Sequence, residues 1–353
     1  MPPISSVVSA LDDIDAVPRP QYAHLQRLSD AIGLFEHARY AVPRPEHGYC
    51  VDDVARGLLV TLREPDPSPA VAQLTETYLR FLEQAIDPQG RVHNRRSIDG
   101  SWLDQPTVGD WWGRAAWALG VASTAARTPL TRRRAARAFT RLAQQGSHDL
   151  HAAAYAALGA GAVLLRTPDD AAAVRLVRGF ARMVPMQGGA EWVWPEPRLR
   201  YGSAAIAEAE IMAGVVLGDA EIREHGLRLL RFLLDVEVRG GHLSVAGTEG
   251  RGPDERGPLF DQQPIEVAAI ADACVRAFDA TGDPSWLSGV RLAWAWFTGV
   301  NDSGIDMIDT DTGAGYDGLE PDGRNENQGA ESTLAALTTW QHARVHQQTW
   351  HRA

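Results

Sequence analysis

The sequence predicts an all-α protein in which inner and outer helices alternate around a closed ring of helical hairpins. Segments rich in Gly, Asp, Trp and Asn lead into small-residue helices about six times, and an amphipathic helix follows each one. The recurrences are roughly 40 to 65 residues apart, which is typical of stacked supersecondary units. The six segments begin at Gly48, Val108, Ser147, Arg200, Leu259 and Asn325.

The inner helices are recognised by small, apolar residues on nearly every side. A helix of that composition is expected to be covered by neighbours all round. The clearest inner helices are predicted at residues 152–165, 204–217, 267–274 and 334–337.

The outer helices have one apolar stripe and one polar face. Between residues 130 and 145, the apolar Ala135, Ala138, Phe139 and Leu142 recur at helical spacing, and arginines occupy the other positions. Such a helix buries one face and leaves the other in water. Further outer helices are predicted at residues 71–85, 171–184, 222–236 and 286–297.

The connections fall into two classes. Those that follow an inner helix are short and contain proline, at residues 127–129, 166–168 and 281–284. Those that follow an outer helix are long, and alternating stretches at 91–94 and 241–245 predict hairpin strands within them. Long structured loops usually serve function, so we expect them to open together at one end of the ring. They cover residues 87–109, 185–201, 239–259 and 301–328.

Composition indicates one domain and excludes several partners. With 353 residues and 44% hydrophobic content, we expect an N-terminal arm at 1–27, one domain at 28–344 and a C-terminal tail at 345–353. A net charge of -11 disfavours nucleic acid and anionic membranes. Two cysteines, no signal-like N-terminus and no long apolar run indicate a cytoplasmic protein. The oligomeric state stays open.

Acidic and aromatic side chains gather where the inner helices begin. Each carboxylate alone could simply cap its helix, and each Trp alone could belong to the core. Together they suit an oligosaccharide, because flat rings cover sugar C–H faces while polar groups bind hydroxyls. The candidate catalytic residues are Asp53, Asp110, Asp261 and Glu331. The candidate binding residues are His37, His47, Asp52, Trp102, Trp111, Trp112, Arg114, Trp192, Trp194, Gln262, Gln263, Asn327 and Gln328.

Four stretches carry a resemblance to a known superfamily. They read GLFEHARYAVPRPEHGYCVDDVARGLL, SWLDQPTVGDWWGRAAWALG, GPLFDQQPIEVAAIADAC and GYDGLEPDGRNENQGAESTLAAL. Together they resemble the six-hairpin glycosidase superfamily with its (α/α)6 toroid, and within it a bacterial glycosidase-like family associated with glycosyltransferases and mannoside phosphorylases. The Asp52-Asp53 pair and the Asn327-Gln328-Gly329 turn are also similar to bacterial endo-α-mannanases. The resemblance implies a neutral, mannose-like substrate.

Glycoside hydrolysis needs one protonated and one ionised carboxyl group. Asp53 and Asp110 are the first candidates for this pair. Asp52 and Asp53 are about 100° apart on a helix, so only one can face the site and the other can cap or pair with Arg56. Asp110 could instead pair with Arg114, four residues later. Shielding by a neighbouring Trp would raise the pKa of a general acid.

Three other functions compete with hydrolysis. Histidines 37, 47, 93, 151 and 242 could serve an epimerase or isomerase, since sugar 2-epimerases on the same toroid use histidines for proton transfer. The same rings and polar groups could serve a non-catalytic sugar-binding protein. A terpene-cyclase-like toroid is disfavoured by the polar mouth. No metal and no cofactor are predicted, because no spacing supports a closed ligand set.

Overall fold

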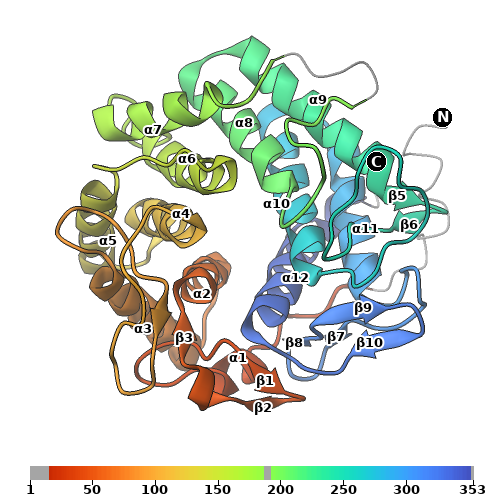
Figure 1. Cartoon of the computed structure of the whole chain (residues 1–353), viewed down its shortest axis with the longest axis horizontal. Coiled ribbons are helices and arrows are strands. Elements are labelled where there is room, and N and C mark those ends of the chain that lie inside the picture. Colours follow the sequence, from red (N-terminus) through yellow and green to blue (C-terminus); the bar gives the residue numbers. More distant parts are fainter. Residues whose placement is uncertain (1–15, 187–191, 351–353) are drawn as a thin grey trace. The chain divides into compact units, whose positions relative to one another are not determined.

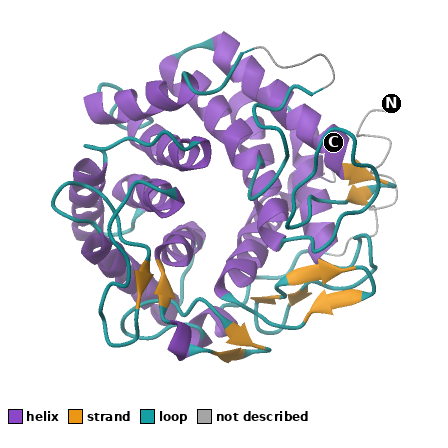
Figure 2. Cartoon of the chain, viewed as in Figure 1, coloured by secondary structure: helices purple, strands orange, loops and turns teal. Residues whose placement is uncertain are grey.

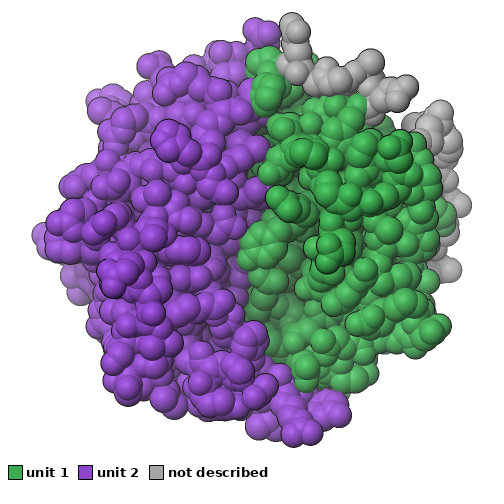
Figure 3. All heavy atoms as spheres, in the orientation of Figure 1, with its two compact units in different colours: residues 1–24, 185–211, 224–353 green, residues 25–184, 212–223 purple. Residues whose placement is uncertain are grey.

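The computed structural model describes residues 16–186 and 192–350. Helices dominate this part of the chain, and its strands are short pairs in the connections (Figure 2). The chain forms two compact units, coloured separately in Figure 3. Unit 1 comprises residues 1–24, 185–211 and 224–353, and unit 2 comprises residues 25–184 and 212–223.

Unit 2 contains three successive helical hairpins. The first helices of the hairpins, α2, α4 and α6, pack against one another, and each also packs against the helix that follows it (Figure 1). The predicted inner helix at 152–165 and the outer helices at 71–85, 130–145 and 171–184 are confirmed, with ends that differ by a few residues. The helices are α2 (Val51–Arg63), α3 (Pro69–Ala85), α4 (Asp110–Ala125), α5 (Pro129–Leu142), α6 (Leu150–Leu164) and α7 (Ala171–Ala181).

The outer helices of unit 2 begin at side-chain caps and bury one stripe. In α5, Thr128 accepts a hydrogen bond from the Thr131 N–H, and Pro129 occupies the first turn. The predicted apolar stripe is buried, including Phe139 and Leu142. Burying each of these two side chains contributes roughly 1.5–3 kcal/mol. The same arrangement of cap and stripe appears in α3 and α7.

Unit 1 contains the remaining hairpins. Helix α10 packs against both α11 and α12, and α11 packs against α12. The division between the two units passes through α8 and α9. All of the helices predicted in this half of the sequence are confirmed. They are α8 (Ala204–Leu217), α9 (Ala220–Glu237), α10 (Pro264–Thr281), α11 (Leu287–Phe297) and α12 (Ala330–Trp350).

Five antiparallel strand pairs lie in the described connections. The hairpin predicted at 241–245 is confirmed by β6, whereas the stretch at 91–94 makes only isolated bridges at Val92 and its strand begins at Arg95. The pairs are β1 (Ala38–Arg39) with β2 (Val42–Pro43), β3 (Tyr49–Cys50) with β4 (Arg95–Arg96), β5 (Val238–Arg239) with β6 (His242–Leu243), β7 (Ile308–Asp309) with β8 (Ala314–Gly315), and β9 (Gly318–Glu320) with β10 (Gly323–Asn325). Three short helices, α1 (Ala23–Arg27), η3 (Pro45–His47) and η4 (Pro284–Trp286), complete the described elements.

The two ends of the described chain meet on α12. The Val17 N–H donates to the Gln347 side chain at 2.8 Å, and the Trp340 indole donates to the Pro18 carbonyl at 2.9 Å. Because these contacts anchor it, α12 continues to Trp350, and the separate tail expected from residue 345 is replaced by helix as far as residue 350. Residues 1–15 of the expected arm and 351–353 of the expected tail lie outside the described residues. No helix that is described has both the length and the apolar composition needed to cross a membrane.

Candidate functional site

The three inner helices of unit 2 begin at one end of the unit. A Cβ atom added at Gly113 of α4 would lie 2.3 Å from the Ala152 carbonyl oxygen of α6, and one at Gly120 would lie 2.3 Å from the Gly159 carbonyl oxygen. Contacts advance in the same direction along both helices, so α4 and α6 are parallel. Their first turns therefore bring Asp110 and His151 close together, which agrees with the electrostatic interaction between these two side chains.

Helix α2 enters the same site through β3. Tyr49 and Cys50 pair with β4, and the Val51 N–H then donates to the Asn94 carbonyl at 2.9 Å. Gly48 turns the chain into β3 with a φ of 71°, and a Cβ atom there would lie 2.2 Å from the Arg96 carbonyl oxygen. Only glycine fits both the conformation and the space. This turn fixes where α2 presents its two aspartates.

Asp110 has a half-buried carboxyl group, and no cationic side chain of the described residues is bonded to it. No hydrogen bond or ion pair joins it to another residue in the described part of unit 2. Burial raises the pKa of Asp110, and this effect exceeds the lowering by the positive charge of Arg114 and by His151; Asp149 and Asp52 raise the pKa further. A carboxyl group with a raised pKa can remain protonated and donate its proton.

Asp52 and Asp53 are both buried and both face an arginine. The Asp53 carboxylate accepts from Arg56 Nη1 at 2.7 Å, so the predicted pairing of one aspartate with Arg56 is confirmed. Asp52 Oδ1 lies 3.5 Å from Arg114 Nε, and its Oδ2 accepts a weak hydrogen bond from the Cys50 thiol at 3.4 Å. Each of the two carboxylates therefore has an arginine beside it.

Arg114 is a buried residue, and its contact with substrate stays a prediction. Its side chain is 2% exposed, because α4 and α6 cover it. The guanidinium lies 4.0 Å from the Tyr155 ring centroid and donates to the Tyr155 hydroxyl at 2.9 Å. The sequence-based alternative, an ion pair of Arg114 with Asp110, gives way to the ion pair with Asp52. Tyr155 was not predicted, because it falls within an otherwise apolar inner helix.

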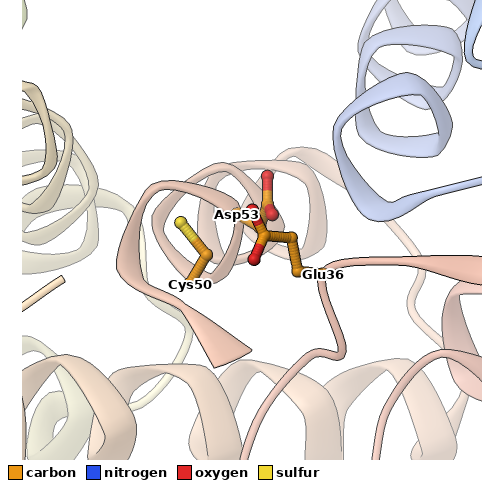
Figure 4. A group of neighbouring side chains, drawn as sticks. All are labelled: Glu36, Cys50 and Asp53. Carbon is orange, nitrogen blue, oxygen red and sulfur yellow. The ribbon is translucent and has the colours of Figure 1, made fainter. Parts of the chain in front are cut away.

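Glu36, Cys50 and Asp53 form a compact group in unit 2 (Figure 4). One ligand-type atom of each residue lies within 4.8 Å of the other two. The carboxylates already have cationic partners, since Arg56 pairs with Asp53 and Arg95 pairs with Glu36. Burial raises the pKa of the Cys50 thiol well above its usual range. Each carboxylate of the group therefore has an arginine beside it.

The histidines and tryptophans predicted around this site have varied environments. His37 and His47 are exposed enough to meet a ligand and contact each other edge to face, with ring centroids 5.0 Å apart. Trp102 is half-buried and stacks on His93 at 5.0 Å. Trp111 is half-buried and donates from its indole to the Val92 carbonyl at 2.8 Å.

Two predicted binding tryptophans are core residues. Trp112 is fully buried, because the helical position after Trp111 points into the packed interior of unit 2. Trp194 in unit 1 is 3% exposed. Neither ring can cover a sugar face without rearrangement. Trp192 is half-buried, and its indole donates to the Glu196 carbonyl at 2.8 Å.

The other predicted catalytic residues, Asp261 and Glu331, lie in unit 1. Burial raises the pKa of Asp261 to about 6, Glu320 raises it as well, a hydrogen bond from Gln263 lowers it, and Asp317 raises it. Asp317 Oδ1 also accepts from the Gly329 N–H at 2.7 Å, at the turn that leads into Glu331 on α12. Asp317 thus connects the two predicted residues. Asp53 and Asp110 lie in unit 2, so a common mouth for all four stays a prediction.

Gln262 and Gln328 are buried in unit 1, and the contact of their side chains with substrate stays a prediction. The Gln262 amide is fully buried because it accepts from the Trp296 indole at 3.2 Å and donates to Asp302 at 2.6 Å. Gln328 is 7% exposed, and its carbonyl bonds the His24 ring at 2.8 Å. Gln263 and Asn327 are partly exposed and remain candidates.

A cavity of about 540 Å³ lies at the opposite ends of α4 and α6. Its lining includes Ser123, Thr124, Arg132, Phe139 and Arg166. Ser123 and Thr124 donate to carbonyls of their own helix, so their hydroxyl protons are already engaged. The cavity has no counterpart to Asp110, and we place the candidate site at the N-terminal ends of the helices.

The fold matches solved structures of sugar-active enzymes. A sugar epimerase from a ruminal bacterium has a TM-score of 0.68 at 14% identity, over 97% of this chain and 98% of that one. Cellobiose 2-epimerase from Spirochaeta thermophila has a TM-score of 0.64 at 14% identity, over 97% and 96% of the chains. A GH76 α-mannanase from Bacteroides thetaiotaomicron has a TM-score of 0.63 at 9% identity, over 99% and 96%.

These likenesses show the fold, which is an (α/α)6 toroid. This confirms the all-α class predicted from the sequence. No protein-family model matches the sequence, and no curated protein is significantly similar to it. At 9–14% identity these likenesses establish the fold and leave the reaction open.

Proposed function

We propose that the protein is a glycoside hydrolase that cleaves a neutral, mannose-containing oligosaccharide, with Asp110 as general acid and Asp52 as base or nucleophile. One observation carries this proposal. Asp110 is half-buried, has a raised pKa and makes no bond to a described residue, whereas Asp52 lies beside Arg114. Two carboxyl groups in such different environments suit the acid and base roles of glycoside hydrolysis.

Asp52 replaces Asp53 as the preferred partner of Asp110. Asp53 is held by Arg56 at 2.7 Å, whereas Asp52 is 3.5 Å from its arginine and contributes to the electrostatic environment of Asp110. The looser ion pair leaves an oxygen of Asp52 able to bind a water or a sugar carbon. The mannose preference draws on the mannanase among the structural neighbours and on the Asp52-Asp53 pair.

Substitution of each carboxylate tests the assignment. Asp110→Asn should reduce cleavage of manno-oligosaccharides by about 100-fold or more, while the affinity for the same sugar changes little. Cleavage by the wild type should fall as pH rises through the raised pKa of Asp110, because the acid must be protonated. The measurements are product mass, reducing-end formation and calorimetric binding. Asp66→Asn, at an exposed aspartate, is the matched control.

Rescue by azide separates the two roles. A small anion can replace a missing base or nucleophile, so azide should restore cleavage by Asp52→Gly and yield a glycosyl azide. Azide should not give that product with Asp110→Asn on a natural oligosaccharide, because the leaving group still lacks its proton. Full activity of either variant without azide would overturn the assignment of that residue.

An epimerase is the second candidate, because His151 lies beside Asp110 and two of the neighbours are epimerases. A histidine and a carboxyl group can move a proton next to a carbonyl. Epimerisation leaves the mass of the sugar unchanged in ordinary water and introduces deuterium from D₂O. A mass-neutral product carrying one deuterium would replace the hydrolase proposal with this one.

A further inference from the structure

Arg114 has two carboxyl groups within reach and forms an ion pair with one of them. It follows Asp110 by four residues on α4, a spacing at which side chains on a helix meet. Its Nε nevertheless lies 3.5 Å from Asp52 on α2, and its Nη2 donates to the Tyr155 hydroxyl on α6 at 2.9 Å. Arg114 therefore contacts Tyr155 in the same conformation in which it lies beside Asp52 rather than Asp110.

Tyr155 is itself fixed. Its side chain is 2% exposed, and its ring stacks on Trp117 with an interplanar angle of 11° and a centroid separation of 5.8 Å. The Arg114 guanidinium lies 4.0 Å from the centroid of the Tyr155 ring, within cation–π range. The phenol oxygen thus stays at one place and determines the direction of the guanidinium.

We propose that Tyr155 is a positioning residue that holds Arg114 against Asp52 and away from Asp110, so that no guanidinium of the described part of the chain is bonded to the Asp110 carboxyl group. The proposal deepens the proposed function, on which its catalytic meaning rests. The position of Arg114 can be tested by a measurement that does not require the protein to cleave a substrate.

The charged groups that face Asp110 come from three helices. They are Arg114 on its own helix, Asp52 on α2, and Asp149 and His151 at the start of α6. Removing the Tyr155 hydroxyl changes none of these groups. It removes the acceptor of the hydrogen bond from Arg114 Nη2, and the guanidinium can then turn toward Asp110, four residues earlier on the same helix. A guanidinium closer to Asp110 lowers the pKa of that carboxyl group.

Carbon-13 NMR of aspartate carboxyl groups measures this change directly. Asp110→Asn identifies the Asp110 signal. In Tyr155→Phe, the pKa of Asp110 should fall by about one unit or more. Tyr78→Phe is the control, because Tyr78 is equally buried but bonds Ser29 at 2.7 Å on an outer helix. That control should leave the Asp110 titration unchanged.

The Tyr155→Phe substitution in an Arg114→Gln variant shows whether Tyr155 acts through Arg114. In Arg114→Gln, adding Tyr155→Phe should not move the Asp110 titration further. An unchanged Asp110 pKa in the single Tyr155→Phe variant would overturn the proposal, and so would an equal shift in both backgrounds. If Tyr155→Phe folds poorly, fluorotyrosine at position 155 keeps the ring and weakens its oxygen as an acceptor, and a shift of the same sign is expected.

The outcome can be separated from that of the proposed function. If the NMR shift occurs but no oligosaccharide is cleaved, Tyr155 has the positioning role and the hydrolase proposal fails. If cleavage occurs and Tyr155→Phe leaves both the Asp110 titration and the pH profile of kcat unchanged, the hydrolase stands and the positioning role fails.

Discussion

At the scale of single residues, environment distinguishes carboxyl groups that look alike in the sequence. The N-terminus of a helix stabilises an anion by roughly 0.3–1 kcal/mol. Asp110 stands at such a position, yet burial still raises its pKa. Asp52 and Asp53 occupy the first turn of α2 and each face an arginine. The partner differs in each case, since Asp53 pairs with Arg56 of its own helix and Asp52 pairs with Arg114 of α4.

Glu237 gives a test of the same principle in unit 1. Its side chain is fully buried, and burial raises its pKa to about 8, with the charge of Glu266 adding to the increase. The folded protein then binds more protons than the unfolded chain between pH 4.5 and 8. Stability should fall as pH rises through that window, by at most about 5 kcal/mol.

Glu237→Gln should remove most of this pH dependence. A glutamine keeps the oxygen that accepts from the Ala246 N–H at 2.8 Å, and it cannot ionise. Urea unfolding at pH 6 and pH 9 measures the difference. Glu249→Gln, at an exposed glutamate in the connection that follows α9, should retain the wild-type pH dependence. Equal pH dependence in Glu237→Gln and the wild type would show that Glu237 is ionised in the folded state.

Some site residues could be predicted from the sequence and others could not. Asp110 and the pairing of Asp53 with Arg56 follow from helix starts and an i,i+3 spacing, which are local. The bond from Arg114 to Tyr155 spans 41 residues and depends on the packing of α4 on α6. Trp112 also could not be predicted, because Trp111 and Trp112 are adjacent in the sequence and only the packing buries the second ring and leaves the first half-buried.

At the scale of elements, small residues set how closely the inner helices approach. A Cβ atom at Gly159 of α6 would lie 2.2 Å from the Ala116 carbonyl oxygen of α4, where only backbone could yield. Gly159→Ala should therefore destabilise the fold by about 1–3 kcal/mol, although alanine favours a helix by about 1 kcal/mol. Gly179→Ala on α7, where nothing lies within 4 Å, should stabilise slightly. Denaturant unfolding of both variants measures the contrast, and a neutral Gly159→Ala would contradict the close approach.

The elements themselves were largely predictable because their signals are local. The apolar stripes of α5 and α9 recur every three or four residues, so their existence follows from spacing alone. The strand near residue 91 was misplaced, since β4 exists only as the partner of β3, which lies more than 40 residues earlier. The length of α12 was missed because contacts with Val17 and Pro18 extend it.

At the scale of the whole molecule, the toroid fold does not determine which reaction the protein catalyses. The same fold appears in epimerases and in a mannanase. The reaction depends on the proton transfers that the side chains of one site carry out. In unit 2, burial raises the pKa of Asp110, and Asp52 lies beside Arg114; the hydrolase proposal rests on this difference between the two carboxyl groups.

Cleavage in water enriched with ¹⁸O tests that proposal most directly. The purified protein is incubated with a panel of manno- and gluco-oligosaccharides, and the products are weighed by mass spectrometry. The account predicts shorter sugars with one ¹⁸O at each new reducing end, and no such product from Asp110→Asn. Sugars of unchanged length that carry no ¹⁸O from bond cleavage, from a protein that still binds them, would contradict it.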